Sequence, residues 1–286
     1  MLKQRVITAT VLLIVLVASL CISPVAFLFL AAVAMGCTQW EWLRICGWNS
    51  VLSGIVGAVV AAGLYYLTCF SPDSAELISN STFMTVLTSV GTVVWTVLTV
   101  IIFMKRNTGW KVPLGLGSIL SFILIPIAWF SLAWLYTSAQ GGTLLMLSVL
   151  AIVWVADIGA YFVGMNVGGP KMCVGISPKK TWSGAVGAVI LVVLIALALS
   201  YAMPQYNFWT SWVLKDANIW TAVLLLFVIV VFSIAGDLFE SALKRTAGIK
   251  DSSNLLPGHG GVYDRIDAQM PVLPLSVFTL LFLQGF

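Results

Sequence analysis

Several acidic residues in the second half of the chain lie within or directly beside long apolar runs. The chain has ten Asp and Glu residues, and six lie in or beside its later polar segments: Asp157, Asp237, Glu240, Asp251, Asp264 and Asp267. Asp237 ends the apolar run VLLLFVIVVFSIAGD, and Glu240 follows about one helical turn later. Two carboxylates at that spacing repel one another in apolar surroundings unless a cation lies between them. The pair therefore favours a neighbouring cation.

The segment KRTAGIKDSSNLLPGHGGVYDRID that follows contains the complementary groups. On a helix, Asp237, Ser241 and Lys244 share one face at steps of four and three. Basic residues bind phosphates, and glycines let the backbone approach an anion and point N–H groups at it. The residues of these kinds are Lys244, Arg245, Lys250, Gly258, His259, Gly260 and Gly261, and Asp264 and Asp267 follow one turn apart. Such a set serves magnesium-assisted phosphoryl or nucleotidyl transfer, although a solvated loop has the same composition.

These polar residues are exceptions in a chain of 286 residues that is 60% hydrophobic and 8% charged. Such a composition does not provide a soluble surface, so we expect an integral membrane protein. A helix crosses a hydrocarbon core of about 30 Å with roughly 20 residues. Nine apolar runs near this length predict an all-α polytopic fold: residues 6–20, 25–46, 51–70, 82–104, 114–137, 142–164, 184–203, 219–239 and 271–286. The first run resembles a secretory signal before Cys21, but Leu20 is too large for that cleavage site, so we expect a retained helix.

The basic residues test this count, because cytoplasmic loops of membrane proteins are enriched in Lys and Arg. With nine crossings, 13 of the 14 basic residues fall on the side of the amino terminus, and Lys215 falls opposite. We therefore expect a multi-pass protein of the cell inner membrane with a cytoplasmic amino terminus and a site facing the cytoplasm. This bias explains the net charge of +4 without nucleic-acid binding. The five cysteines form no CxxC pair and predict neither a disulfide framework nor a metal cage.

Two units are expected along the chain. Residues 1–140 would form a scaffold of five membrane helices that carries any dimer contacts, and residues 141–286 would form four helices with the catalytic loops. Asp157 falls inside the sixth expected helix, where a carboxylate costs at least about 2.5 kcal/mol unless it is paired or hydrated. It is either part of a site or an interfacial carboxylate. The segment SPKKTW, residues 177–182, is either a phosphate clamp or an ordinary basic loop with an interfacial tryptophan.

The order of these residues resembles the signature of the phosphatidate cytidylyltransferases, also called CDP-diacylglycerol synthases. The matching positions are Ser241, Leu243, Lys244, Arg245, Lys250, Asp251, Ser253 and the segment LPGHGGVYDRID from Leu256 to Asp267. The resemblance extends to GDLFES, ADIGAYFVG and ISPKKTWSG and to the hydropathy profile of the whole chain. It implies a Mg²⁺-dependent nucleotidyltransferase of phospholipid biosynthesis. Phosphatidate would attack the α-phosphorus of CTP and give CDP-diacylglycerol and pyrophosphate.

The resemblance also implies roles for single residues. Asp237 and Asp264 are the expected metal ligands, for Mg²⁺ and a second cation such as K⁺. The expected catalytic residues are Asp237, Asp264, Lys244, Lys250 and Asp267, with Asp157, Glu240 and Asp251 as auxiliary acids. The expected substrate-binding residues are Ser177, Lys179, Lys180, Thr181, Ser241, Arg245, His259, Gly260, Gly261 and Arg265. CTP, phosphatidate and the lipid bilayer are the expected partners, and a homodimer is a further expectation.

Some residues depart from this pattern or stay outside it. Ser183 and Asn166 stand where many relatives carry an acid and a basic residue. Glu41, between two tryptophans, is expected to form an interfacial ion pair with Arg44 and is left outside the site. Two other protein classes would show different sequence features. A transporter would typically show paired broken helices in two related halves, and the sequence shows no such symmetry. A CDP-alcohol phosphotransferase would carry its own DGxxAR motif, and a CTP-dependent polyprenol kinase would lack the complete HGGxxDRID pattern.

Overall fold

Long helices make up most of the part of the chain that the structure describes. The computed structural model describes residues 2–138 and 142–285. Within these ranges the long helices are α1 (Leu2–Ile22), α2 (Pro24–Ile45), α3 (Ser50–Cys69), α5 (Ser81–Met104), α6 (Leu114–Thr137), α7 (Gly142–Asn166), α8 (Trp182–Ala202), α10 (Ile219–Thr246) and α12 (Gln269–Gln284). Among the residues that the structure describes, eight spans are long and apolar enough to cross a membrane, the last of them Tyr263–Gln284, and the apolar part of α1, Val6–Ile22, is shorter. The prediction of an all-α polytopic membrane protein is confirmed.

Shorter elements connect these helices. Helices α4 (Ser74–Ser79) and α9 (Trp209–Asp216) lie between long helices, and α11 (Tyr263–Ile266) immediately precedes α12. Strands β1 (Lys171–Cys173) and β2 (Ser177–Thr181) form an antiparallel hairpin between α7 and α8. This hairpin is not predicted by the sequence pattern. Its residues are too few and too polar to show the alternation of a longer strand.

The predicted ends agree with the observed ones within a few residues except at α10. That helix continues past residue 239 to Thr246. The extra turns are polar, but side chains four residues apart stabilise them: Ser241 donates to Asp237 at 3.4 Å and Lys244 pairs with Glu240 at 2.6 Å. Asp237 therefore lies inside a continuous helix and not at its end.

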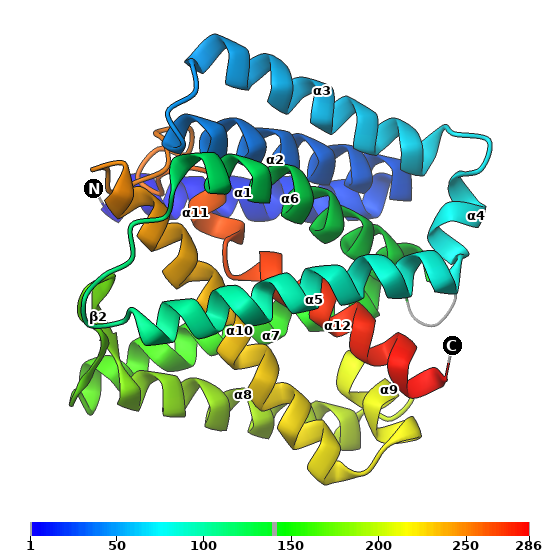
Figure 1. Cartoon of the computed structure of the whole chain (residues 1–286). Coiled ribbons are helices and arrows are strands. Elements are labelled where there is room, and N and C mark those ends of the chain that lie inside the picture. The colour runs from blue at the N-terminus through cyan, green and yellow to red at the C-terminus, as the bar shows by residue number, and fades with distance from the viewer. Residues whose placement is uncertain (1, 139–141, 286) are drawn as a thin grey trace.

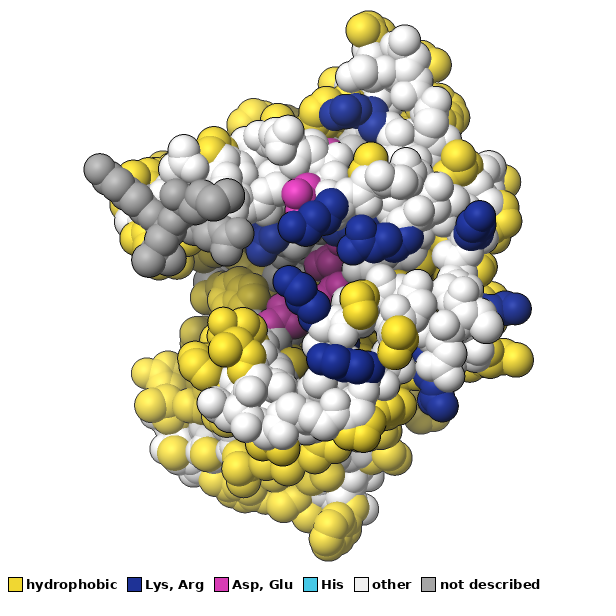
Figure 2. All heavy atoms as spheres, turned by 90° about the vertical axis from the view of Figure 1, so that its left-hand side faces the viewer, with side chains coloured by type: hydrophobic (Ala, Val, Ile, Leu, Met, Phe, Trp, Pro, Cys, Tyr) yellow, Lys and Arg dark blue, Asp and Glu magenta, His cyan; other side chains and the backbone are white. Residues whose placement is uncertain are grey.

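The long helices run back and forth between the two ends of the molecule (Figure 1), with the amino terminus at one end and the carboxyl terminus at the other. The β-hairpin and α11 lie toward the end that carries the amino terminus. We call this the basic end, because Figure 2 shows Lys and Arg side chains spread over this face. The helix ends, loops and hairpin at this end contain Arg44, Lys105, Arg106, Lys111, Lys171, Lys179, Lys180, Lys244, Arg245, Lys250 and Arg265. The alternation of helices separates these residues from Lys215 in α9 at the other end, as the charge pattern predicts.

Small residues allow the closest helix approaches, as is usual when both partners are apolar. A Cβ atom at Gly91 of α5 would lie 2.7 Å from Ile127 of α6 and 3.1 Å from Pro274 of α12. Likewise, α7 meets α8 at Gly159, where an added Cβ would lie 3.1 Å from Ala188. Helices from both expected units therefore pack against one another, and they share one apolar core.

Candidate active site

Carboxylates from several elements gather in a recess at the basic end. Asp157 and Asp237 each lie nine residues before the last residue of their helix. At 1.5 Å per residue this depth is about 14 Å for both. Figure 2 shows acidic side chains lying in a hollow of this face, among Lys and Arg side chains. Substrate groups would reach these acids past a basic rim.

Lys180 of the β-hairpin reaches into this recess and pairs with Asp237 at 2.8 Å. Burial of Lys180 disfavours its charged form, but nearby carboxylates, above all Asp237, outweigh that cost and raise its pKa above the ordinary value. Lys180 therefore stays protonated near neutral pH. This ion pair joins the hairpin to α10, whereas a role of SPKKTW as a phosphate clamp stays a prediction.

The loop between α5 and α6 braces the hairpin. The N–H of Gly175 donates to the carbonyl of Arg106 at 2.9 Å. A Cβ atom at Gly175 would lie 2.2 Å from the backbone nitrogen of Gly109, so only glycine fits in this turn. At the other end of the hairpin, the Thr181 side chain accepts from the N–H of Gly184 and caps α8. The position of Lys180 is therefore fixed from both sides.

A cavity of about 630 Å³ opens beside this ion pair, between α7, α8, α10 and the hairpin. Its charged lining residues are Asp157, Lys171, Lys179, Lys180 and Asp237. Its apolar lining includes Ala160, Tyr161, Met165 and Ile234. Charged and apolar groups thus share one wall, which suits a molecule with a charged head and an apolar body.

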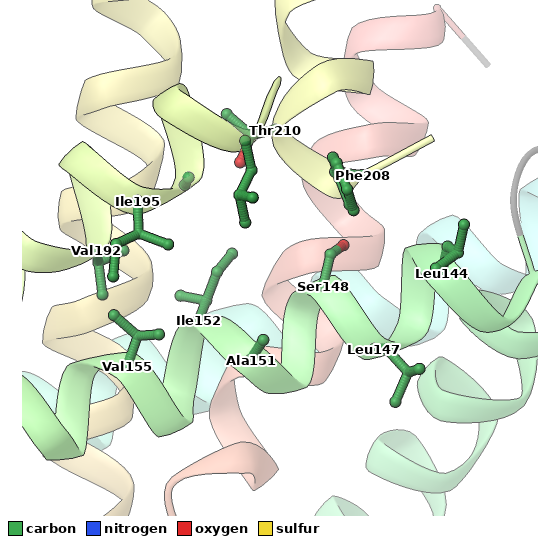
Figure 3. Close-up of a pocket in the computed structure, with 12 residues that line it drawn as sticks. Leu144, Leu147, Ser148, Ala151, Ile152, Val155, Val192, Ile195, Phe208 and Thr210 are labelled. Atoms are coloured by element: carbon green, nitrogen blue, oxygen red, sulfur yellow. The ribbon is translucent and has the colours of Figure 1, made fainter. Parts of the chain in front are cut away.

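A second cavity, of about 200 Å³, has a different character (Figure 3). It lies between α7, α8 and the chain around α9, and its lining is almost wholly aliphatic, with Ser148 and Thr210 as its polar side chains. Of the described residues, no charged one lines it. An anionic ligand would therefore find counter-charges in the first cavity and not in this one.

Lys244 organises a second group of carboxylates. It pairs with Glu240 at 2.6 Å and with Asp264 of α11. The other oxygen of Asp264 accepts hydrogen bonds from Ser252 N at 2.9 Å, Ser252 Oγ at 2.7 Å and Gly261 N at 2.8 Å. Asp264 thus ties the segment between α10 and α11, residues 247–262, to α10. We call this segment the α10–α11 loop.

The glycines of this loop allow close contact with carboxylates of the protein itself. Gly260 has φ +84°, and an added Cβ would lie 2.7 Å from Asp264. A Cβ at Gly261 would lie 2.0 Å from Ser252 Oγ and 2.4 Å from Glu41 Oε1. The N–H of Gly261 is already donated to Asp264. Phosphate contacts by His259, Gly260 and Gly261 stay a prediction.

The prediction for Glu41 is wrong. Its side chain is fully buried in α2 and accepts hydrogen bonds from the α10–α11 loop and from Tyr263, whereas Arg44 lies over the ring of Trp40 at 4.8 Å. An isolated carboxylate inside an apolar helix is costly wherever it occurs. Glu41 therefore carries the same signal as Asp157, a carboxylate within an apolar helix, but the nearby arginine and tryptophans favoured an interfacial ion pair.

Two further acids lie deep in the site. Asp267 is 9% exposed and accepts from Ala268 N at 2.8 Å, and Glu240 is 1% exposed. The Glu240 oxygen that does not face Lys244 is buried and has no hydrogen-bond partner among the described residues. A Cβ at Gly236 would lie 2.4 Å from the carbonyl of Asp267, so a glycine in α10 lets the α11–α12 junction approach.

The carboxylates of the recess have the chemistry that a bound cation needs. Within the described ranges, the ion pairs involve only two ammonium groups, those of Lys180 and Lys244, and they face carboxylates in excess. A buried excess of negative charge, with one carboxylate oxygen unpartnered, favours a cation. No three of the described His, Cys, Asp and Glu side chains form a ready-made cage. Mg²⁺ commonly takes one or two carboxylates and completes its shell with water and substrate phosphates, so the set fits that ion.

The remaining predicted residues divide between the rim and the interior. Lys179, Arg245, Lys250, Asp251 and Arg265 are exposed at the basic end. Ser177 and Ser241 are partly buried and Thr181 is buried. Of the two departures from the pattern, Ser183 donates to the carbonyl of Gly168, and Asn166 donates to the carbonyl of Phe162 at 2.9 Å. Both of these side chains serve local structure.

Similarity to known proteins extends over nearly the whole chain. Residues 3–283 match the model of a family described as the cytidylyltransferase family. A relative from Pseudomonas aeruginosa, named phosphatidate cytidylyltransferase, is 37% identical over 286 residues, which cover 96% of this chain and 95% of the relative. A relative of the same name from Haemophilus influenzae is 33% identical over 300 residues, covering 99% of each chain. A third, from Staphylococcus epidermidis, is 36% identical over 158 residues, covering 54% of this chain and 56% of that protein.

Proposed function

Because the chain belongs to the cytidylyltransferase family and is thus a nucleotidyltransferase of the membrane, we propose that it transfers the cytidylyl group of CTP to phosphatidate. The products are CDP-diacylglycerol and pyrophosphate. The observation that carries this proposal is the cavity at the basic end, where Lys180 and Asp237 share a wall with apolar side chains. A lipid phosphate has the same two-part character. The names of the relatives from Pseudomonas and Haemophilus support the same substrates.

The reaction needs little proton chemistry. The second pKa of a phosphate monoester is about 6, so the phosphatidate phosphate is largely dianionic near neutral pH and needs no general base. One of its oxygens forms a bond to the α-phosphorus of CTP, and the bond from that phosphorus to the β-phosphate bridging oxygen breaks, with the electron pair leaving on pyrophosphate. His259 would then contribute hydrogen bonds and not proton transfer.

Repulsion between the two anionic substrates is the main obstacle, and positioning and neutralisation lower it. Lys180 and Lys244 carry the charges inside the recess, and Lys179, Lys250 and Arg265 line its approach. Asp237 and Asp264 would hold Mg²⁺, with K⁺ as the second cation. The bound metal would neutralise the triphosphate and act as a Lewis acid at the α-phosphorus.

The same basic residues indicate how the protein is oriented in the membrane. Lys and Arg collect on the cytoplasmic side of bacterial membrane proteins, so we place the basic end and the recess at the cytoplasmic face of the inner membrane. CTP would enter from the cytoplasm through the basic rim, and phosphatidate from the adjacent leaflet.

Labelled CTP tests this proposal. Purified protein in detergent is incubated with phosphatidate, Mg²⁺ and CTP labelled either at the α- or at the γ-phosphate. We expect the α label in the lipid product and the γ label in pyrophosphate. A lipid that carries the γ label would instead identify a CTP-dependent kinase. Folded wild-type protein that labels no lipid in either arm would refute the proposed function.

A further inference from the structure

Glu41 joins the amino-terminal helices to the α10–α11 loop. It lies in α2, yet each of its carboxylate oxygens accepts from residues more than 200 positions away. Oε1 accepts from Val262 N at 3.0 Å and from Ser253 Oγ. Oε2 accepts from Tyr263 N at 2.7 Å and from Ser252 Oγ at 3.2 Å. Since the side chain is fully buried, these four donors replace its hydration shell.

The same loop residues also contact Asp264. Ser252 Oγ lies 2.7 Å from Asp264 and 3.2 Å from Glu41, and its single hydroxyl proton serves one of the two at a time. Gly261 N donates to Asp264, whereas the next two backbone N–H groups donate to Glu41. The loop is therefore held between two carboxylates, and one of these pairs with Lys244 inside the site.

Aromatic packing strengthens this junction. Tyr263 is 1% exposed and stacks on Trp42 with ring centroids 4.8 Å apart and an interplanar angle of 13°. Trp42 is the next residue after Glu41 in α2. Glu41 thus binds the backbone of Tyr263, and Trp42 packs on its side chain. Tyr263 directly precedes Asp264.

We propose that Glu41 is a positioning residue for the transfer reaction, which fixes the α10–α11 loop so that Asp264 and Lys244 face the recess in one geometry. Glu41 acts through these residues and does not contact substrate. The catalytic part of the proposal rests on the proposed function. The anchoring of the loop does not, because it is measured without substrate.

The chemistry of the contact explains why a carboxylate is needed here. Each oxygen accepts one backbone N–H, so both must be acceptors. A Gln side chain has one acceptor oxygen, and in either orientation its NH₂ group faces a backbone N–H. An Asp side chain keeps the charge but is shorter by one methylene, so it does not reach both donors.

Hydrogen–deuterium exchange on the full-length protein in detergent tests the anchoring. The variants are Glu41→Gln and Glu41→Asp. The matched control is Gln39→Met, which removes a buried hydrogen bond from α2 to Ser121 of α6 and leaves the loop untouched. In the Glu41 variants we expect exchange in residues 251–263 to rise about tenfold to a hundredfold, the range for losing a hydrogen bond to a charged group, with exchange elsewhere unchanged. Gln39→Met leaves loop exchange at the wild-type rate.

Activity supplies a second readout that general destabilisation would not change. If Glu41 positions Asp264, the Mg²⁺ concentration for half-maximal CDP-diacylglycerol formation rises in both Glu41 variants, and kcat falls about tenfold or more. A variant that is merely less stable would lose active molecules but keep the wild-type Mg²⁺ requirement. Unchanged loop exchange in Glu41→Gln, or a released loop with an unchanged Mg²⁺ requirement, would overturn the proposal.

Ser253→Ala covers the case in which Glu41→Gln does not fold. It removes one donor to Glu41 and keeps the other three, so we expect a smaller increase in loop exchange in the same direction. Wild-type exchange in a folded Ser253→Ala protein would count against the proposal. Wild-type protein that forms no CDP-diacylglycerol would end the proposed function, and the exchange rates would still decide the anchoring.

Discussion

Gly261→Ala is expected to release the α10–α11 loop by steric overlap alone. The backbone of Gly261 does not lie in the left-handed region, so alanine meets no conformational penalty there. Its Cβ, however, would lie 2.0 Å from Ser252 Oγ and 2.4 Å from Glu41 Oε1. Ordinary contact needs about 3.4 Å or more, so these groups must separate by about 1 Å or more. Hydrogen bonds of 2.7–3.0 Å between the loop and the two carboxylates do not survive such a shift.

The size of the effect follows from these bonds. Each hydrogen bond to a charged group contributes about 1.5–3 kcal/mol, and the loss of two corresponds to about 3–6 kcal/mol. At about 1.4 kcal/mol per factor of ten, the docked loop becomes at least a hundredfold less populated. We expect CDP-diacylglycerol formation to fall by at least that factor in a protein that still elutes as a folded species.

Gly248→Ala is the matched control, because Gly248 lies in the same loop at φ +72° with no atom within 4 Å of an added Cβ. It introduces backbone strain of about 1–2 kcal/mol without overlap, so its effect should be smaller. A Gly261→Ala protein that keeps more than a third of wild-type activity, or a Gly248→Ala protein that loses more activity than Gly261→Ala, would contradict steric release of the loop.

Three further predictions concern the other groups of the site. Asp237→Asn and Asp264→Asn each abolish CDP-diacylglycerol formation while the protein still inserts and purifies as wild type; measurable turnover in either variant would remove that residue from the metal site. Because the pKa of Lys180 is raised, its pairing stabilises the folded protein fully below the ordinary lysine pKa and is lost only as pH rises through the raised value. The difference in melting temperature between wild type and Lys180→Met should therefore not decrease between about pH 6 and 9, and a difference that shrinks across this range would contradict the assignment. Burial raises the pKa of the Cys173 thiol, although Lys180 and Arg106 partly oppose this, so Cys173 should resist maleimide at neutral pH until the protein is unfolded in detergent, as mass spectrometry of the labelled peptides would show.

The membrane helices were predictable because each must be apolar along its own sequence, whatever it packs against. A helix that crosses the hydrocarbon core must be apolar over its full length, so composition and run length mark it wherever it packs. Lys and Arg then fix the sidedness of the expected topology. The acids of the site stood out for the same reason, because Asp157 and Asp237 interrupt apolar helices. The hairpin with Lys180 was predictable only as a basic segment, and the extension of α10 needed side-chain pairs that hydropathy does not register.

What the sequence determined by itself is the set of helices, their ends within a few residues, and the acids and bases that family resemblance assigns to a site. Tertiary structure decided which of them meet. In a membrane helix the residues that face lipid and those that face other helices are both apolar, so periodicity does not reveal which way a helix is turned. Lys180 meets Asp237, and Glu41 meets the α10–α11 loop, across distances in sequence that only helix packing closes. For the same reason, the role of Gly261 beside two buried carboxylates became visible only once α2 was in place.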